Sequence, residues 1–600
     1  MTDQALITLL FLTVAIILMV MEWLRADLVA LLLALGLAVA GVITLQEAFS
    51  GFSRPAVITI LAIFILTQGL YRTGVTQRIG DGLYWLTHGR PTRLLFLTMA
   101  IGASLSLFMN NLAAAALLMP AVMDAARRSR ANPSRLLMPL AFAVTLGGTA
   151  TLLTTSNILA SAVLRDQGLT PFGLLDFLPV GLPMLIVGVS YLLFAGRRLL
   201  PAINTVEHFA DAPDTPNGLA EIYALDERLS EIEIPPGSPL AGKSLAASQI
   251  GERFGLSILA IRREGQPLRL APGPEQVVRA GDSLLVAGQP ERVRQLTEMG
   301  GRLIHANAGT PGLATEEVTL LEVIPAPRGA AVGRTLKELR FREKYGLSVV
   351  ALWRGGRPYR TDVGDMPLQF GDALLVHGLR ERVAFLHSDP DFIVLTEPEV
   401  PPRARKGWLA VMIMTVTLLA AAFNLAPVAE AMMLGALGMI LTGCLTMDEA
   451  YQAIEWRSIF LIAGMLPASI ALTQSGATQW LGQLAVTALA RWGPMALAGG
   501  LFLLATALTQ VLSGQVAAVV VTPVAIAAAQ QIGADPRAVA MAAALGCSMA
   551  FMTPTSHPVN LFVMGPGGYR FRDFLRVGLP LTLLELAVVM LVLPIFWPLR

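Results

Sequence analysis

Charged residues are scarce in this sequence. Asp, Glu, Lys and Arg together make up 14% of the 600 residues, and 54% are hydrophobic. Soluble proteins average about 25% charged residues, so this balance excludes a soluble enzyme and indicates a polytopic membrane protein. The formal net charge is only +2. The chain therefore lacks the basic surface of a nucleic-acid-binding protein, and we expect no nucleic-acid partner.

Cysteine is almost absent, and so is the signature of a cleaved signal peptide. The two cysteines, Cys444 and Cys547, both lie inside apolar segments, which argues against a disulfide framework and a thiolate metal site. The amino terminus, Met1 to Gln4, lacks the basic residues that open a signal peptide. The apolar run behind it meets charged residues from Glu22 onward and then continues, so we interpret it as a retained first span.

One long apolar run contains a polar interruption. Between Leu94 and Ala126 the neighbouring amides Asn110 and Asn111 stand among apolar residues, and no charge occurs before Asp124. Amides in hydrocarbon need partners, and the run is too long for one straight span. We therefore predict two helices that meet at Asn110-Asn111 in a re-entrant hairpin. Irregular backbone at membrane depth occurs only where protein or a water-filled cavity covers it, so the tip should line a site.

The same pattern occurs a second time. The run from Thr509 to Pro523 repeats it, with Ser513-Gly514 in the place of Asn110-Asn111. Further matches pair Glu47-Ala48-Phe49 with Glu449-Ala450-Tyr451, Gly147 with Gly546, and the stretch 176–183 with 573–580. The membrane part is therefore a duplicated half. Paired interrupted segments at corresponding places in two halves are the best sequence indication of a transporter's binding site.

The fold we predict is a polytopic α-helical membrane protein, an inverted repeat of five spans plus a re-entrant hairpin in each half, with a central cytoplasmic α+β insert. The first half has spans at 5–21, 28–42 and 55–70, an amphipathic piece at 76–87, the hairpin, a broken segment at 136–164 and a last span at 178–194; the second half repeats these at 408–423, 429–441, 459–472, 478–489, 495–530, 539–564 and 577–596. An odd number of crossings gives the halves opposite orientations. The arginine distribution places both termini outside, so the first hairpin enters from the cytoplasm and the second from outside.

The insert is itself a duplication. The stretches 254–262 and 280–288 recur as 345–354 and 370–378, and runs rich in proline, at 211–218 and 397–403, flank the insert. We predict four domains: 1–203, the first transmembrane repeat; 204–308 and 309–405, two small α+β modules; and 406–600, the second transmembrane repeat.

Four polar interruptions should converge in the membrane: Asn110-Asn111, 147–157, 513–515 and 546–560. Their hydroxyl, amide and freed carbonyl oxygens suit an alkali cation. Half-helices that start at Leu112, just after Asn157, after Gln515 and after Asn560 would turn their positive amino ends toward an anion. None of the four contains Asp, Glu, Lys or Arg, which favours sodium over proton coupling.

Two titratable residues lie in or near these segments. His557 could respond to pH within the site, and a histidine bonded only to neighbouring backbone is the equal alternative. Glu585, in the last span, is the weaker candidate for a proton-linked role, because a structural hydrogen-bonding group explains it as well.

The predicted site has no catalytic residue, and its coupling ions are sodium. One cation is assigned to Asn111, Gly147 and Thr151, and a second to Ser513, Gly514, Gly546 and Thr553. The anion between them is assigned to Asn110, Asn111, Thr155, Ser156, Asn157, Ser513, Gln515, Thr555, Ser556 and Asn560.

The membrane halves resemble the divalent anion:sodium symporters of the ion transporter superfamily. The motifs are Asn110-Asn111-Leu112 and Ser513-Gly514-Gln515, where that family shows Ser-Asn-Thr, together with 147–151, 549–554 and 560–571. The resemblance implies sodium-driven transport of sulfate or a dicarboxylate by a homodimer in the cell (inner) membrane, in contact with lipid, with an elevator-like motion of each hairpin domain.

The insert resembles a tandem pair of the TrkA carboxy-terminal (RCK carboxy-terminal) modules of potassium-uptake regulators. That implies dimerisation and a regulatory ligand, nucleotides included; a structural dimerisation platform is the alternative. No Gly-x-Gly-x-x-Gly follows a predicted strand, so the dinucleotide-binding domain of those regulators is missing. Two other functions stay open. One is a monovalent cation transporter or antiporter gated by the insert, although no midplane carboxylate is seen. The other is a transport-like sensor.

Overall fold

The computed structural model describes residues 2–21, 23–75, 91–128, 132–201, 223, 229–254, 256–263, 266, 269–273, 275–306, 318–325, 331–354, 357–360, 362–369, 372–387, 389, 391–394 and 406–599. The chain divides into two compact units: Met1–Ile203 with Pro401–Arg600, and Asn204–Val400. The domain boundaries predicted at 203/204, 308/309 and 405/406 fall on or beside residues outside the described ranges, as does the predicted amphipathic piece at 76–87.

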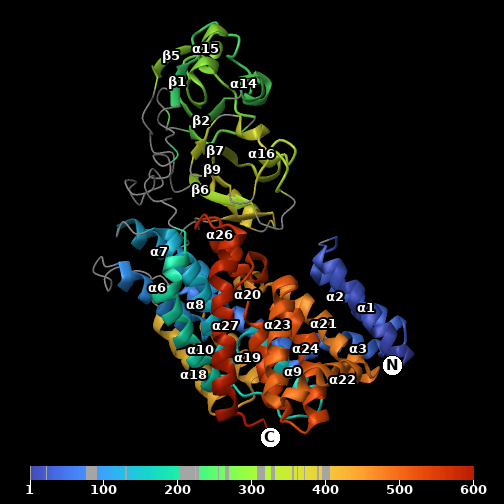
Figure 1. Ribbon diagram of the computed structural model, residues 1–600. Helices are drawn as coiled ribbons and strands as arrows, with labels where there is room; N and C mark the ends of the chain where they lie inside the picture. Colours follow the sequence, from blue (N-terminus) through green and yellow to red (C-terminus); the bar gives the residue numbers. More distant parts are fainter. Residues whose placement is uncertain are drawn as a thin grey trace. The chain divides into compact units, whose positions relative to one another are not determined.

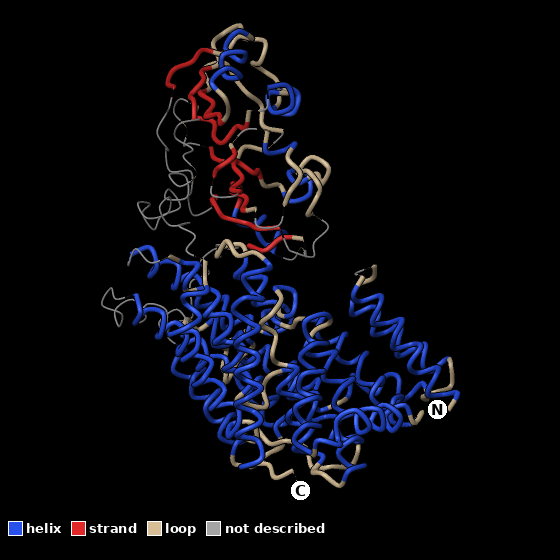
Figure 2. Tube along the Cα trace, in the orientation of Figure 1, coloured by secondary structure: helices blue, strands red, loops and turns tan. Residues whose placement is uncertain are grey.

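The first unit is helical (Figures 1 and 2). Its first half contains α1 (Asp3–Val20), α2 (Ala26–Val39), α3 (Leu45–Phe49), α4 (Pro55–Arg72), α6 (Pro91–Ser106), α7 (Asn111–Arg128), α8 (Leu137–Thr149), α9 (Thr155–Asp166), α10 (Leu178–Tyr191) and α11 (Arg197–Leu199). Its second half contains α18 (Gly407–Ala422), α19 (Val428–Leu441), α20 (Met447–Ala453), α21 (Trp456–Gln474), α22 (Ala477–Leu489), α23 (Pro494–Val511), α24 (Gly514–Ile532), α25 (Pro536–Cys547), α26 (Pro558–Met564) and α27 (Phe571–Phe596).

Several of these helices can cross a membrane. Among the described residues, seven helical segments are long and apolar enough: Asp3–Val20, Leu45–Arg72, Leu178–Leu199, Trp456–Gln474, Pro494–Val511, Gly514–Ile532 and Phe571–Phe596. Shorter apolar helices, such as α8 and α25, come in pairs with another helix across a break. The predicted class, a polytopic helical membrane protein with an α+β insert, is confirmed.

Matching start signals open the same short helix in both halves. In α3 the Thr44 hydroxyl accepts the backbone N–H of Glu47, and the Glu47 carboxylate accepts the N–H of Thr44. In α20, Thr446 and Glu449 make the same two bonds. This reciprocal capping satisfies two donors that a helix start otherwise leaves free. The duplicated Glu-Ala-aromatic motif therefore marks a duplicated helix start.

Two matching glycines let a broken helix lie directly on a hairpin arm. A Cβ at Gly147 in α8 would collide with the backbone carbonyl oxygen of Ala103 in α6. A Cβ at Gly546 in α25 would collide with that of Phe502 in α23. Small residues at such crossings are how membrane helices approach closely. The close contact is the same in both halves.

The second unit contains two sheets of identical topology. The first has β1 (Leu229–Glu233), β2 (Ser257–Arg262), β3 (Arg269–Leu270), β4 (Ser283–Ala287) and β5 (Arg302–Ala306), in the order β3-β2-β4-β1-β5. The second has β6 (Val318–Pro325), β7 (Ser348–Arg354), β8 (Arg357–Tyr359), β9 (Ala373–Leu379) and β10 (Phe392–Val394), in the order β10-β6-β9-β7-β8. Read in reverse, the second order is β8-β7-β9-β6-β10, so each strand takes the place of its counterpart in the first sheet. All of these strand pairs are antiparallel.

The two sheets share one apolar core. Leu259 and Leu285 of the first sheet lie in the same buried cluster as Leu320 and Leu375 of the second. The alternate residues of each strand point away from this shared core. They form one separate outer cluster on each sheet. Those outer clusters are covered by α14 (Ile250–Phe254) and α15 (Pro290–Glu298) on one sheet, and by α16 (Phe341–Tyr345) and α17 (Arg380–His387) on the other. The unit is thus built in four layers, with the sheets face to face inside.

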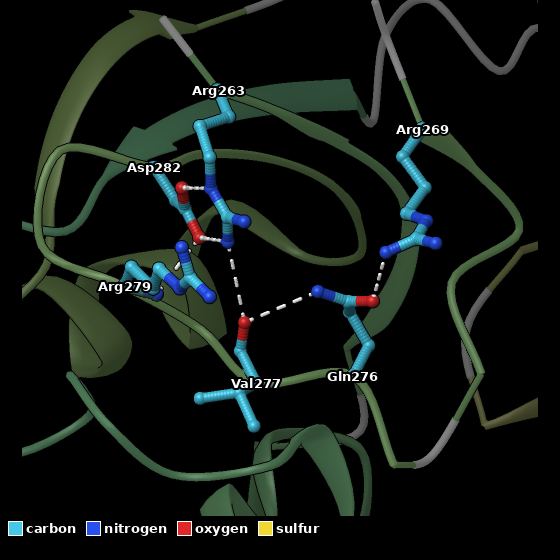
Figure 3. A network of polar contacts seen from close by, with 6 residues as sticks. All are labelled: Arg263, Arg269, Gln276, Val277, Arg279 and Asp282. Carbon is cyan, nitrogen blue, oxygen red and sulfur yellow. Dashed lines mark hydrogen bonds and ion pairs between the residues drawn. The ribbon is translucent and has the colours of Figure 1, made fainter. Parts of the chain in front are cut away.

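One ion pair recurs in both sheets. Arg263, after β2, donates two hydrogen bonds of 2.7 Å to the carboxylate of Asp282, which also accepts the backbone N–H of Arg279 (Figure 3). Burial would raise the pKa of Asp282, but the bonds from Arg263 and Arg279 lower it below its usual range. The carboxylate is therefore held in its charged form.

The second sheet repeats the arrangement. Arg354 donates two bonds, of 2.7 and 2.6 Å, to Asp372, which accepts the backbone N–H of Gln369. Both aspartates are 1% exposed. A buried bidentate Arg–carboxylate pair fixes geometry as well as charge. In both sheets the pair ties the end of one strand to the turn that precedes the neighbouring strand.

Candidate functional site

The first hairpin tip is closed by its own polar side chains. Helix α6 ends at Ser106 and α7 begins at Asn111, and the two helices pack against each other. The Asn110 side-chain oxygen accepts the backbone N–H of Leu112 at 2.8 Å, as a helix cap does. The Ser106 hydroxyl donates to Asn111 Oδ1 at 2.6 Å. The two amides therefore hold the turn and stand at the start of α7.

The tip is tied to the first broken helix. The Thr151 hydroxyl, in the break between α8 and α9, donates to the carbonyl of Leu107 at 3.0 Å. Asn157 then donates from Nδ2 to the carbonyl of Thr151 at 2.8 Å. Both bonds satisfy carbonyls that the interrupted helices leave free. Hairpin and break thereby form one hydrogen-bonded unit.

The second half makes the same bonds at the corresponding positions. The Thr553 hydroxyl donates to the carbonyl of Gln510 at 3.1 Å. Asn560 Nδ2 donates to the carbonyls of Ala550 at 2.7 Å and Thr553 at 3.1 Å. Leu107 and Gln510 each stand three residues before the first residue of the tip pair, Asn110 and Ser513. The duplication thus extends to individual hydrogen bonds.

Two buried amide oxygens are left over. Asn157 Oδ1 and Asn560 Oδ1 have no hydrogen-bond partner among the described residues, and both residues are 0% exposed. An unpaired buried acceptor costs about 1–3 kcal/mol, so its presence needs a physical reason. Amide and carbonyl oxygens can replace the hydration shell of an alkali cation. The two oxygens occupy equivalent places in the two halves, one beside each break.

The four interruptions meet. Helix α9 packs against α24 and α25, and α26 packs against α7 and α8. Two polar contacts join interruptions of different halves: Ser156 Oγ lies 2.9 Å from Ser548 Oγ, and Asn111 Nδ2 lies 3.5 Å from His557 Nε2. The expected convergence of the interruptions is found, at uncharged groups.

The half-helices begin earlier than predicted. Helix α7 begins at Asn111, α9 at Thr155, α24 at Gly514 and α26 at Pro558. The predictions of Leu112 and of starts after Asn157, Gln515 and Asn560 were therefore wrong by one to several residues. Polar residues fit the first turn of a helix as well as an unwound loop, because its N–H groups are free. Asn157 and Asn560 consequently stand in first turns.

The other predicted residues lie in varied settings. The Ser513 hydroxyl caps α24 by accepting the N–H of Val516 at 3.4 Å, and Ser556 donates to the carbonyl of Thr553 at 2.7 Å. Thr155 is half-buried and Thr555 is exposed. Gln515 borders a small apolar void with Leu159, Leu461, Ile462, Met465, Val516 and Val519. Gln515 therefore lies beside α9 and α21.

Sequence reasoning missed a side chain, Gln510, that forms hydrogen bonds across the break in the second half. Gln510 donates from its amide nitrogen Nε2 to the carbonyl of Met549 at 2.7 Å and accepts the N–H of Met552 at 3.1 Å. The neighbouring Thr509 hydroxyl donates to the carbonyl of Cys547 at 3.2 Å. The signal was visible as an amide inside an apolar helix, one turn before the tip. Ser106 and Ser548 were missed because a lone serine in a membrane helix is common.

Glu585 lies outside the four interruptions in the sequence. In α27 it is 0% exposed, and neither carboxyl oxygen has a hydrogen-bond partner among the described residues. Gly188 of α10 leaves room for it, since a Cβ there would come within 2.6 Å of Oε1. The carboxyl group therefore belongs to the contact between α10 and α27.

Paired hairpins and broken helices that meet at neutral oxygens are the construction of a secondary transporter. The family comparison agrees: the model described as "Citrate transporter" (CitMHS) matches residues 16–546. The chain belongs to this family of membrane transporters, as the resemblance of its motifs predicted, and so it is a transporter and not an enzyme.

Two of the relatives match almost the whole chain. It is 36% identical to the "Uncharacterized transporter sll0640" of Synechocystis, over 98% of this chain and 97% of that one. It is 33% identical to the "Uncharacterized transporter YfbS" of Escherichia coli, over 100% of both. It is 27% identical to the "Probable sodium/sulfate cotransporter 3" of Chlamydomonas reinhardtii, over 60% of this chain and 42% of that one.

Among solved structures, the RCK domain of GsuK matches 27% of this chain and 63% of its own, with 15% identity and a TM-score of 0.13. A likeness of this size identifies no ligand for the insert.

Proposed function

We propose that the protein is a sodium-driven symporter of a small divalent anion, either sulfate or a dicarboxylate. Each half inserts its hairpin as a re-entrant pair, in opposite orientation, so that the two tips meet near the bilayer midplane. Both termini face outside, and the insert is cytoplasmic. The protein works as a homodimer in the cell (inner) membrane, in contact with lipid. The observation that carries the proposal is the pair of buried amide oxygens of Asn157 and Asn560, which have no hydrogen-bond partner in the described part of the chain.

Each half supplies neutral oxygens for one sodium ion. The first site takes Asn111, Gly147 and Thr151, with the free Asn157 oxygen added. The second takes Ser513, Gly514, Gly546 and Thr553, with the free Asn560 oxygen added. The free amide oxygens fit the donor set that an alkali cation needs. Neutral ligands leave the cation's charge uncompensated, which suits a neighbouring anion.

The anion lies between the cations, at Asn110, Asn111, Thr155, Ser156, Asn157, Ser513, Gln515, Thr555, Ser556 and Asn560. Helices α7, α9 and α24 begin among these residues. Their free N–H groups and positive dipole ends attract negative charge without a buried arginine. Two sodium ions balance one divalent anion, so only inward cotransport of more than two cations per divalent anion would gain about 2.3 kcal/mol per net charge per 100 mV.

The choice of anion rests on the relatives. The family model is described as a citrate transporter, and a relative in Chlamydomonas is named a probable sodium/sulfate cotransporter. Citrate and sulfate are both compact oxyanions of multiple charge. The two modules of the insert, 204–308 and 309–405, regulate transport by binding a small cytoplasmic ligand such as a nucleotide.

Uptake by purified protein in liposomes tests the proposal. Labelled sulfate and succinate are offered with an inward sodium gradient, with equal sodium on both sides, and with potassium in place of sodium. We expect uptake of one of the anions to exceed its equilibrium level only with the gradient. Equal uptake in all three conditions would contradict sodium coupling. A potassium flux that persists without any anion would instead favour a monovalent cation transporter gated by the insert.

A further inference from the structure

Glu585 stands where equivalent positions of the two halves meet. Gly188 and Glu585 each lie five residues after the end of the matching stretches 176–183 and 573–580. The two positions are in contact, since a Cβ at Gly188 would come within 2.6 Å of Glu585 Oε1. Helices α10 and α27, which carry them, pack against each other. The carboxyl group is therefore placed between the two repeats, opposite a position that has no side chain.

This carboxyl group has no polar partner. Glu585 is fully buried, and neither of its oxygens has a hydrogen-bond partner among the described residues. The space opposite, at Gly188, is bordered by the side chains of Leu146 and Leu581. A structural hydrogen-bonding group would have a donor or an acceptor within reach. The described part of the chain therefore gives that explanation of Glu585 no support.

The charged groups on the helices around this contact lie elsewhere. Helix α10 carries one titratable residue, Tyr191, whose hydroxyl donates to the carbonyl of Val577 at 3.1 Å. Helices α8 and α23 carry none. Arg537 of α25 pairs with Asp176 and lies over the ring of Trp597. The remaining titratable residues of the packed helices are Arg93 of α6, Arg197 and Arg198 of α11, Cys547 of α25, and Arg572, Asp573 and Arg576 of α27.

The arginines closest along α10 and α27 are too distant for an ion pair. Arg576 is nine residues from Glu585, and Arg197 is nine residues from Gly188. At about 1.5 Å per residue, such a separation spans roughly 14 Å of helix. An ionised Glu585 would thus be a buried charge without a counter-charge, which is costly enough that a carboxyl group takes up a proton instead. In the packed arrangement Glu585 is a neutral acid.

Helices α10 and α27 also rest on the two breaks. A Cβ at Gly181 of α10 would collide with the backbone of Ala150 in the first break. A Cβ at Gly578 of α27 would collide with the carbonyl oxygen of Phe551 in the second. Each helix thus touches one break, and the serine contact described above joins the breaks to each other. Separation of α10 from α27 therefore requires a change in at least one contact of a break.

We propose that Glu585 is a proton-binding site between the two halves, and that the bound proton keeps α10 packed on α27 and so favours the present arrangement of the breaks. Release of the proton requires the helices to separate, because only then can water solvate the carboxylate. The proton controls the arrangement and is not a transported solute. By linkage, any ligand that prefers one arrangement of the breaks should bind with a pH-dependent affinity. The inference needs no transported anion and goes beyond the proposed function.

The alternative is a carboxylic acid that only fills space. Such a group would keep its proton at every pH at which the protein is folded. Its replacement by the neutral amide of glutamine would then leave the pH dependence of the packing between α10 and α27 unchanged.

Two measurements on the purified full-length protein test this site. Infrared difference spectra between wild type and Glu585→Gln, at neutral pH, show whether Glu585 carries a proton. We expect the C=O band of a protonated carboxyl group in wild type and its loss in the variant. Hydrogen exchange of α10 and α27 shows whether the proton holds the helices together. From acidic to alkaline pH, exchange in wild type should rise severalfold more than in Glu585→Gln, whose amide stays neutral.

Glu430→Gln is the matched control. It makes the same chemical change at an exposed position in α19, and its exchange in α10 and α27 should follow that of wild type. An absent carboxyl band, or an equal pH dependence of exchange in wild type and Glu585→Gln, would overturn the inference. If Glu585→Gln does not fold, Glu585→Met, neutral and of similar volume, replaces it in both measurements. Neither measurement involves sodium or an anion, so a failed uptake experiment would contradict the proposed function alone.

Discussion

The two hairpins are tied to their broken helices in the same way and differ at their tips. Thr151 donates to Leu107, directly after α6, and Thr553 donates to Gln510, in the last turn of α23. Gly147 and Gly546 allow equivalent crossings. The first tip is held by amides and a serine, whereas the second is held by a single capping serine.

The bonds around the breaks differ as well. Gln510 spans the second break with two bonds, and its counterpart Leu107 contributes only a backbone carbonyl to the first. The shared contacts fix where each break lies, and the differing ones set what each break offers to a ligand. A duplicated framework can thus keep its geometry while its two copies acquire different chemistry.

The largest expected effect tests the shared crossing. Gly147→Ala and Gly546→Ala each place a methyl group against a backbone carbonyl, so the helices must separate; overpacking of this kind costs about 1–3 kcal/mol. We expect each variant to lose more than nine-tenths of sodium-driven uptake and to melt at a lower temperature. Gly438→Ala in α19 is the control, since its Cβ would meet only the Ile413 side chain, at 3.5 Å. Near-normal uptake in either variant would show that transport does not need the close helix crossing in that half.

The next effect concerns the free amide oxygens. Asn157→Ala and Asn560→Ala each remove one, and we expect the sodium concentration for half-maximal uptake to rise at least tenfold in both. Asn560 also donates to two carbonyls, so its variant should lose more stability, by about 1 kcal/mol per hydrogen bond. Sodium titrations followed by uptake and by thermal shift measure the two effects separately. An unchanged sodium concentration for half-maximal uptake in both variants would contradict the assignment of sodium to these oxygens.

A smaller effect should appear in one half only. Gln510→Leu keeps the size of the side chain and leaves the carbonyl of Met549 and the N–H of Met552 without partners, which costs about 1–3 kcal/mol for each buried group. The matched change Leu107→Met in the first half should cost under about 1.5 kcal/mol, because it conserves volume. Thermal unfolding of the two variants compares the halves directly, and equal losses would contradict the asymmetry.

The smallest effect concerns the insert. The pKa of Asp282 is lowered in the folded state. The ionised carboxylate therefore makes its full contribution to the free energy of unfolding at pH values above the unfolded pKa, about 3.9. That contribution is lost as the pH falls through the lower, folded value. Asp282→Asn should therefore be less stable than wild type near neutral pH and approach it in acid. Hydrogen exchange of β4 in the full chain, at several pH values, measures this. A difference that does not shrink in acid would contradict it.

The sequence predicted the elements well and their contacts poorly. The repeated residues around Asn110 and Ser513 located the breaks between α6 and α7 and between α23 and α24, because a polar pair inside an apolar run is rare unless the helix is interrupted there. The starts of α9 and α26 were misplaced, since the residues of a first turn look like those of a loop. The contact between Ser156 and Ser548 and the hydrogen bonds of Gln510 depend on how helices distant in sequence approach each other. No local sequence pattern contains that information.

The insert shows the same limit. The recurring stretches predicted two α+β modules, and each has its helices and strands. The pairing of the two inner sheet faces was not predicted, because either face of an alternating strand looks equally apolar when both are buried.

That shared core has a consequence for assembly. An apolar sheet face of this kind needs a cover, and a free module would have to recruit another polypeptide to provide one. Here β6 of the second copy begins at Val318, and eleven residues separate it from the end of β5 at Ala306. The second sheet is therefore present at a high effective concentration, whatever the amount of protein in the cell. The stoichiometry of the pair is fixed by the peptide bond, and a fragment that contained one copy alone would expose the face and aggregate.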